Sequence, residues 1–137
     1  MDDLEKGLSV YSDFFGQETA DARKAGFGGD HFGAPIGEIA MRFAFGAVWA
    51  RDGLERKQRS LVVMGILIAN RQTAELKKHV QIGLRNGLTV REIEEVLVQA
   101  IPYAGFPAVA TATEAVMAKL KELGIPLDNL ERAPAAR

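Results

Sequence analysis

Apolar residues recur at intervals of three and four along most of the chain, a spacing typical of helices that turn one side to a core. The first such segment covers residues 4–15 and ends at Gly16, and a short polar helix is expected over 18–24. Five glycines lie between Gly26 and Gly37 and predict a flexible connection.

The middle of the chain holds two more predicted helices. The first begins near Pro35, ends by Gly53 and has one apolar face, made of Ile36, Ile39, Ala40, Phe43 and Ala47. The second covers residues 55–70. From Leu61 onward it is apolar on every side, which places that part in the middle of the predicted core.

Stop and capping signals divide the last third of the chain. A helix over 73–85 ends at Asn86-Gly87, and Thr89 with Glu92 forms a capping box that starts the next helix. The apolar stripe of that helix consists of Ile93, Val96, Leu97, Ala100 and Ile101. Residues 103–107 are expected to form a turn. A last helix over 107–123 is expected to bury Val109, Ala112, Val116 and Leu120.

The pattern contains no strand-like alternation and no internal repeat. We therefore expect an all-α fold, a compact antiparallel helical domain that spans residues 1–137. The tail over 131–137 is expected to be flexible.

Composition excludes several classes of protein. The chain has 17 basic and 18 acidic residues and a net charge of −1, which argues against binding to nucleic acid. It has no cysteine, which excludes a disulfide scaffold, a zinc–thiolate site, an iron–sulfur cluster and thiol redox chemistry. The longest apolar run, residues 61–69, is shorter than the roughly 20 residues of a membrane span, and the acidic start does not resemble a signal peptide. We expect a cytoplasmic protein.

One titratable pair lies on the 73–85 helix. Glu75 precedes His79 by four residues, so both side chains share one face at the border of an apolar stripe. Such a position favours a proton donor with a tuned pKa. On spacing alone, an exposed Glu–His pair is the more common arrangement. A metal site is not expected, because His31 is remote in sequence and no His-Glu-x-x-His pattern occurs.

Arginines and aromatic residues supply the other candidates. Arg51, which follows Trp49, and Arg59, which borders the apolar run, are candidate clamps for a carboxylate. The neighbouring cations at 56 and 57 are interpreted as a solvated rim. The hydroxyl of Tyr103 is a candidate donor to a substrate oxygen, or Tyr103 is a structural residue at a helix corner. His31 is expected to be exposed.

Several motifs occur in register from about Phe43 to Ala112. They comprise Trp49-x-Arg51-x-Gly53-Leu54, Arg59-Ser60-Leu61, Glu75-Leu76-x-x-His79, Asn86-Gly87-x-Thr89-x-x-Glu92-Ile93-x-Glu95-Val96 and Tyr103-x-Gly105-x-Pro107. Together they resemble the carboxymuconolactone decarboxylase family. The wider superfamily includes alkylhydroperoxidase D-type disulfide reductases, which carry Cys-x-x-Cys-x-x-x-His on the corresponding helix. This chain has Gln72 and Glu75 in place of the cysteines, so the resemblance points to the branch without thiol chemistry.

The chain departs from the family pattern at two positions. The decarboxylases read Trp-Gly-Glu-x-Trp before the arginine, whereas this chain has Phe45 and Ala47 at the first aromatic and the glutamate. Ser60 stands where the disulfide reductases often place a glutamate. Because Ala47 replaces the glutamate of the decarboxylases, a different reaction stays open as an alternative.

The resemblance implies a cofactor-free carboxy-lyase that converts a lactone of the 4-carboxymuconolactone type to 3-oxoadipate enol-lactone, a step of aromatic catabolism in the β-ketoadipate pathway. In this scheme His79 donates the proton, and Glu75 orients the imidazole ring or relays the proton. Arg51, Arg59, Tyr103 and Trp49 form the substrate site. No metal or organic cofactor is implied. The partners are the small anionic lactone and further copies of the chain, in a trimer or a hexamer.

Two alternatives stay open. One is a related proton-transfer reaction, an isomerisation or retro-aldol cleavage of another small lactone or oxo acid. The other is an oligomeric binding protein that kept the fold without catalysis.

Overall fold

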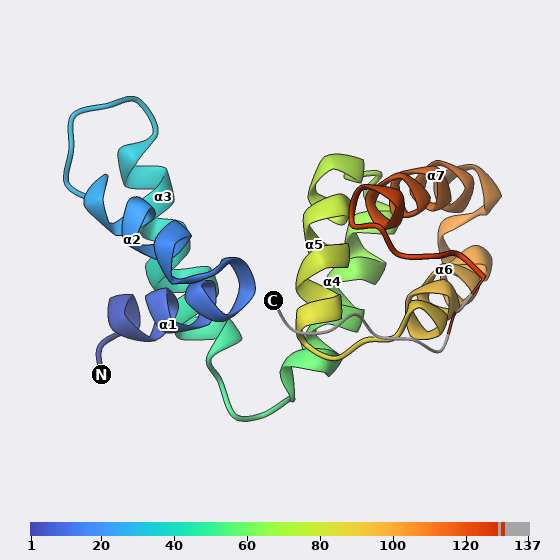
Figure 1. Ribbon diagram of the computed structural model, residues 1–137, viewed down its shortest axis with the longest axis horizontal. Coiled ribbons are helices and arrows are strands. Elements are labelled where there is room, and N and C mark those ends of the chain that lie inside the picture. Colours follow the sequence, from blue (N-terminus) through green and yellow to red (C-terminus); the bar gives the residue numbers. More distant parts are fainter. Residues whose placement is uncertain (129, 131–137) are drawn as a thin grey trace. The chain divides into compact units, whose positions relative to one another are not determined.

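The computed structural model describes residues 1–128 and 130, and in these residues the chain forms seven α-helices, one π-helix and no strand (Figure 1). The all-α class is therefore confirmed. The chain divides into two compact units, one over Met1–Glu55 and one that begins at Arg56. A single domain over 1–137 stays a prediction, and the tail predicted to be flexible lies outside the described residues.

The first unit consists of α1 (Asp3–Phe15), α2 (Gln17–Ala25), α3 (Ala34–Ala40) and the π-helix η1 (Met41–Trp49). A capping box starts α1. The Glu5 amide donates to the Asp2 carboxylate at 2.8 Å, and the Asp2 amide donates to the Glu5 carboxylate at 3.0 Å. The predicted polar helix is confirmed as α2. A connection follows α2 as predicted, but it ends at Gly33, which has a φ of 92° and precedes α3, so Gly37 is helical. The flexibility expected of this connection stays a prediction.

Helices α1 and η1 pack together at two glycines. A Cβ on Gly7 would overlap the carbonyl oxygen of Met41, and a Cβ on Gly46 would overlap that of Asp3. The two backbones can approach this closely because neither position carries a side chain. Aromatic rings fill the adjacent space, where Phe14 lies edge-on to Trp49 with ring centroids 5.1 Å apart.

The apolar face predicted after Pro35 is present, but its large residues are exposed. Ile36, Ile39 and Phe43 all face solvent. The buried residues of this segment are instead Ala34, Met41, Gly46 and Trp49. Phe43 lies in the π-helix η1, in which each turn contains more residues, so the buried positions are displaced from those of the single α-helix that was predicted. Ile36 and Ile39 lie in the regular helix α3, whose apolar face is left in solvent.

The second unit consists of α4 (Arg56–Ala69), α5 (Thr73–Arg85), α6 (Val90–Ala104) and α7 (Phe106–Glu122) (Figure 1). Its core is aliphatic, and its buried members come from all four helices and the α5–α6 connection: Met64, Ile68, Leu76, Val80, Leu84, Leu88, Val90, Ile93, Leu97, Val109, Ala112, Val116 and Leu120. The bounds predicted for α5 and the buried residues predicted for α7 are confirmed.

Two sequence signals were predicted at the ends of α6, and one is confirmed while the other differs in extent. The capping box of α6 is confirmed, since the Glu92 amide donates to Thr89 Oγ1 at 3.1 Å and the Thr89 amide donates to the Glu92 carboxylate at 2.9 Å. The predicted turn over 103–107 is wrong in extent. Helix α6 continues to Ala104 and α7 begins at Phe106, because Gly105, with a φ of 91°, reverses the chain in a single residue.

From Leu61 onward, helix α4 was expected to lie in the middle of the core, and this expectation is wrong. Met64 and Ile68 are buried, but Val62 is 55% exposed and Ile66 is 53% exposed. The reason is geometric, because α5, α6 and α7 cover one side of α4 and nothing in the described part of the second unit covers the other. In the described part of the chain, no helix combines the length and apolar character that a bilayer span needs.

Candidate active site

His79 lies in the second turn of α5, and its ring is half-buried with the Nδ1 atom inside the protein. Burial lowers the pKa of His79 below its ordinary value of 6.5, because the interior stabilises the charged imidazolium less well than water does. The carboxylate of Glu75 opposes this shift, and the ammonium of Lys78 adds to it. His79 thus has a tuned environment, and it is the histidine on which the sequence analysis centred.

Glu75 lies one turn before His79 on the same face of α5, as predicted. Its exposed carboxylate accepts a hydrogen bond from Lys78 Nζ at 3.2 Å. Glu75 and Lys78 therefore form an exposed pair of opposite charges next to the histidine. Glu75 raises the pKa of the imidazole, and Lys78 lowers it. Lys78 was not among the predicted site residues, although its spacing of three residues from Glu75 indicates the pair.

Arg59 lies at the start of α4, half-buried, with its Nε atom inside the protein. The next residue, Ser60, is fully buried and accepts a hydrogen bond from Asn86 Nδ2 at 2.9 Å. Asn86 ends α5, so this bond joins the start of α4 to the end of α5. The contact between Ser60 and Asn86 was not predicted, because nothing local to residues 60 and 86 shows that they meet.

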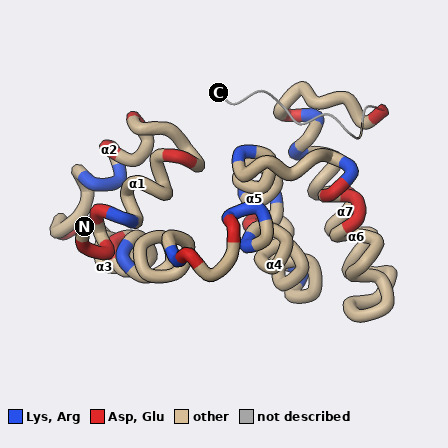
Figure 2. The backbone as a smooth tube through the Cα atoms, turned by 90° about the horizontal axis from the view of Figure 1, so that it is seen from below, with Lys and Arg blue, Asp and Glu red and all other residues tan. Residues whose placement is uncertain are grey.

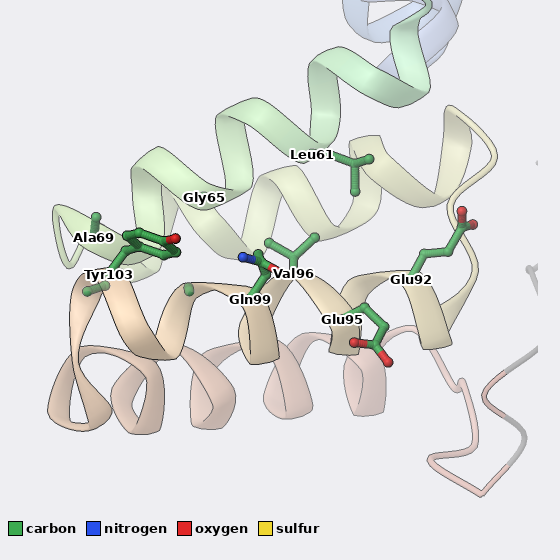
Figure 3. Close-up of a pocket in the computed structure, with 10 residues that line it drawn as sticks. Leu61, Gly65, Ala69, Glu92, Glu95, Val96, Gln99 and Tyr103 are labelled. Carbon is green, nitrogen blue, oxygen red and sulfur yellow. The ribbon is translucent and has the colours of Figure 1, made fainter.

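Tyr103 lies near the end of α6 and is 87% exposed. Its ring borders one end of an apolar groove between α4 and α6 (Figure 3). Among the described residues, the lining of this groove contains neither His79 nor Arg59. The interpretation of Tyr103 as a packed residue at a helix corner does not fit this exposure.

Trp49 and Arg51 belong to the first unit. Trp49 is buried at the end of η1 against the ring of Phe14. Arg51 follows after Ala50 and is exposed, and its backbone amide donates to the carbonyl of Val48 at 3.1 Å. A buried indole thus fixes the backbone from which the Arg51 side chain projects.

The rim of cations at the start of α4 is partly structural. Lys57 Nζ lies 2.9 Å from the Glu92 carboxylate and so connects α4 to the cap of α6. The backbone amide of Thr89 and the ammonium of Lys57 hold the pKa of Glu92 below its ordinary value. Lys57 therefore has a structural partner, and its interpretation as a solvated rim residue outside the site stays a prediction. Within residues 1–128 and 130, no group of three or more His, Asp or Glu side chains is placed to ligate a metal ion.

Comparison with known proteins agrees with the motif pattern. A model of the carboxymuconolactone decarboxylase family matches residues 34–118. The chain belongs to this family. The match contains all six residues that the sequence analysis placed in the site, and it extends beyond the region of resemblance on both sides.

Two relatives of this family member cover most of its length. The 4-carboxymuconolactone decarboxylase of Acinetobacter baylyi is 30% identical over 128 residues, which cover 93% of this chain and 94% of that protein. The nitrosuccinic acid decarboxylase of Metarhizium robertsii is 33% identical over 128 residues, which cover 93% of this chain and 86% of that protein. Both relatives are named as decarboxylases, and their named substrates differ.

Proposed function

We propose that this family member catalyses the cofactor-independent decarboxylation of a small dicarboxylate that can itself accept the electrons released with CO2. The observation that carries the proposal is the half-buried His79, whose pKa is lowered, in a chain similar over 93% of its length to two decarboxylases. The first candidate substrate is a lactone of the 4-carboxymuconolactone type.

The reaction requires one proton and no redox partner. When the C–C bond to the carboxylate breaks, CO2 leaves and the bonding electrons pass into the conjugated lactone carbonyl to give a dienolate. The protonated imidazole of His79 then donates a proton to carbon, and solvent restores that proton afterwards. The substrate is its own electron sink, and the protein positions it, stabilises the developing charge and delivers the proton.

The environment of His79 suits this role. Burial makes the imidazolium a stronger acid, which favours transfer to a carbanion. The same shift reduces the protonated fraction at neutral pH. A bound dianion would offset that reduction, because negative charge near the ring raises its pKa. We propose Glu75 as a positioning residue that raises the pKa of the ring in the free enzyme.

The remaining candidates have roles in binding. Arg59 and Arg51 are proposed to hold the two carboxylates, because a guanidinium matches two carboxylate oxygens. Tyr103 is proposed to donate to the lactone oxygen, and Trp49 to support the backbone at Arg51. These assignments predict that Arg59→Lys raises KM more than it lowers kcat, since charge is kept and the bidentate geometry is lost.

A nitro dicarboxylate is the second candidate substrate, and the 33% identity to the nitrosuccinic acid decarboxylase favours it. A nitro group next to the departing carboxylate accepts the electrons as a nitronate, in the way that the lactone carbonyl does. Ala47, which stands in place of the glutamate of the family pattern, makes a changed substrate reasonable. The proton donor would be the same in both reactions.

The deciding experiment measures CO2 release and ultraviolet absorbance together, with 4-carboxymuconolactone and with nitrosuccinate. We compare the wild type with His79→Gln, and with His31→Gln as a matched control, because His31 is exposed and is the other histidine of the chain. His79→Gln should lower kcat by about 10²- to 10⁴-fold, the usual contribution of a general acid, while His31→Gln should leave it unchanged.

Three outcomes would contradict the proposal in different ways. Full activity of a folded His79→Gln variant would remove His79 as donor. An absorbance change without CO2 would indicate an isomerase or a related proton-transfer enzyme. A folded wild-type protein that releases no CO2 from either substrate, or from a wider set of lactones and oxo acids, would contradict decarboxylation.

The pH profile tests the role of Glu75. If protonated His79 is the donor, kcat/KM decreases as the pH rises through the His79 pKa. Glu75→Gln removes a charge that raises this pKa, so the decrease should move to lower pH. Lys78→Gln is the matched control and should move it to higher pH. If both variants keep the wild-type profile, Glu75 does not act through His79.

A further inference from the structure

Helices α4 and α5 are joined by the chain at one end and by side chains at the other. Residues 70–72 connect the end of α4 to the start of α5, and the two helices pack against each other (Figure 1). At the opposite end α4 begins and α5 ends, and we call this the open end of the pair. Arg59 lies at the open end, whereas His79 lies in the second turn of α5. The position of Arg59 relative to α5 therefore depends on what holds the open end.

The charges of α4 are confined to its first turn. Arg56, Lys57 and Arg59 lie there, and residues 60–70 contain no Lys, Arg, Asp or Glu, so this stretch of the tube is tan in Figure 2. The amides of a first turn have no acceptor within their own helix, so helix ends fray more readily than helix middles. An anion that binds to Arg59 thus depends on the turn of α4 that the helix itself holds least.

Asn86, which ends α5, contacts this first turn directly. Its Nδ2 atom donates to Ser60 Oγ at 2.9 Å and makes a second, longer bond of 3.5 Å to the carbonyl oxygen of Arg56. Arg56 and Ser60 are about one helical turn apart, so a single amide group bridges the turn from which Arg59 extends. Because a carbonyl oxygen can only accept, the nitrogen of the side-chain amide must face α4.

The backbone of Asn86 is held by the end of α5. Its amide donates to the carbonyl of Ile82 at 2.9 Å. Gly87, with a φ of 97°, then turns the chain so that the Leu88 amide donates to the carbonyl of Gly83 at 2.9 Å. The Asn86 side chain therefore extends toward α4 from a backbone that three successive helix-end bonds and turns keep in place.

The bond between Asn86 and Ser60 fixes geometry in a way that apolar packing does not. Ser60 has no exposed surface, and a buried hydroxyl costs free energy unless it is hydrogen-bonded. Two apolar residues of similar shape would avoid that cost, so the stability of the core does not by itself require this polar pair. Apolar contacts, such as those of Met64 one turn along α4, have no preferred direction, whereas a hydrogen bond sets a distance and an angle.

We propose that Asn86 is a positioning residue, which through Ser60 holds the first turn of α4 so that Arg59 meets a substrate carboxylate in bidentate geometry. This role rests on the proposed function, in which Arg59 binds a carboxylate and His79 donates the proton. A guanidinium matches two carboxylate oxygens only in one orientation, so a small displacement of its backbone weakens the contact. Because His79 lies away from the open end, loss of the Asn86 bond should weaken substrate binding more than proton transfer.

The first test compares the steady-state kinetics of Asn86→Ala and Ser60→Ala with those of the wild type, on the proposed substrate from which CO2 is released. Each variant should raise KM about three- to tenfold, the effect of one lost hydrogen bond, and should change kcat less than about twofold. The double variant should raise KM little more than either single variant, because both remove the same bond. Alanine fits the space of Ser60, so Ser60→Ala decides the test if Asn86→Ala does not fold.

Thr89→Ala is the matched control for a loss of stability. Thr89 lies in the same α5–α6 connection, and its side-chain hydrogen bond joins it to Glu92 in the cap of α6. This variant should lower the free energy of unfolding by an amount similar to that of Asn86→Ala, as measured with urea, but should leave KM unchanged. A purely structural role of Asn86 predicts instead that the two variants have the same KM.

A double-variant cycle tests whether Asn86 acts through Arg59. In an Arg59→Lys background the bidentate geometry is already lost, so Asn86→Ala should raise KM less than about twofold further. The same KM increase in this background as in the wild type would overturn the proposal, because Asn86 would then act by another route.

Two other results would also overturn the role of Asn86. One is an unchanged KM in Asn86→Ala and in Ser60→Ala, and the other is an equal rise of KM in Thr89→Ala. All these results would leave CO2 release by the wild type intact and so would not contradict the proposed function. A wild type that releases no CO2 would overturn the proposed function together with the role of Asn86.

Discussion

The two units of the chain are held together by different kinds of packing. In the first, α1 and η1 approach through Gly7 and Gly46, and aromatic rings fill the space beside them. In the second, four helices enclose aliphatic side chains such as Met64 and Ile93. Close backbone approach requires the absence of a side chain, whereas an aliphatic core requires the right total volume. The same type of substitution should therefore have different effects in the two units.

The largest difference is expected for glycine substitutions. Gly46→Ala should destabilise the protein by about 3 kcal/mol or more, because its Cβ overlaps the backbone of α1. Gly65→Ala should stabilise it by about 0.5–1 kcal/mol, because Gly65 is helical and the space around it is open. Urea unfolding measures both changes. Hydrogen exchange should show that Gly46→Ala first loses protection in α1 and η1, and equal effects of the two substitutions would contradict the comparison.

Core substitutions should show a smaller difference. Phe14→Leu should cost about 2 kcal/mol, because Phe14 is fully buried and lies edge-on to Trp49, an arrangement worth about 0.5–1.5 kcal/mol beyond area alone. Ile93→Leu keeps the volume of the aliphatic core and should cost less than about 1.5 kcal/mol. Unfolding by denaturant measures both. A larger loss in the free energy of unfolding for Ile93→Leu would show that the core of the second unit depends on side-chain shape as strictly as the core of the first unit.

The two capping boxes allow a matched comparison at smaller magnitude. Asp2→Ala and Thr89→Ala each remove a side-chain bond to an N-terminal amide and should each cost about 1 kcal/mol. Asp2→Asn and Thr89→Ser keep an accepting oxygen and should recover most of the loss. Equal stability of the alanine and the conservative variant at either site would show that this cap is not required.

The smallest effect is expected in the pH dependence of the free energy of unfolding. Because the pKa of His79 is lower in the folded protein than its usual 6.5, the folded state binds fewer protons than the unfolded chain around and below that pH. The lowered pKa of His79 therefore contributes to the free energy of unfolding above pH 6.5, and this contribution is lost as the pH falls through the folded-state pKa. His79→Gln should lose this dependence and gain stability relative to wild type at low pH, as measured by thermal unfolding from pH 5 to 8.

Local signals explain what could be predicted of the fold. The bounds of α5 and the start of α6 depend on residues a few positions apart, and both predictions are confirmed. The exposed Ile39 and Ile66 were not predictable in the same way, because periodicity shows that a face is apolar and not whether another element covers it. The π-helix has no such local signal either, and it displaced the buried positions of residues 41–49.

In the candidate site, too, some features follow from local spacing and others depend on tertiary contacts. The shared face of Glu75 and His79 follows from helical spacing, and the structure has it. The burial that lowers the pKa of His79 and the bond between Ser60 and Asn86 depend on helices that meet across the fold. The functional roles of these residues stay predictions until the variants are measured.

The amino-acid sequence by itself determined the helical class, the cap of α6, the shared face of Glu75 and His79 and the motifs that indicate the family, because each depends on residue type at short spacing. Tertiary structure decided which apolar faces are covered, where two backbones approach through glycine, and how far the imidazole is removed from water. These properties depend on the positions of elements distant in sequence, and burial and electrostatic free energies follow from those positions.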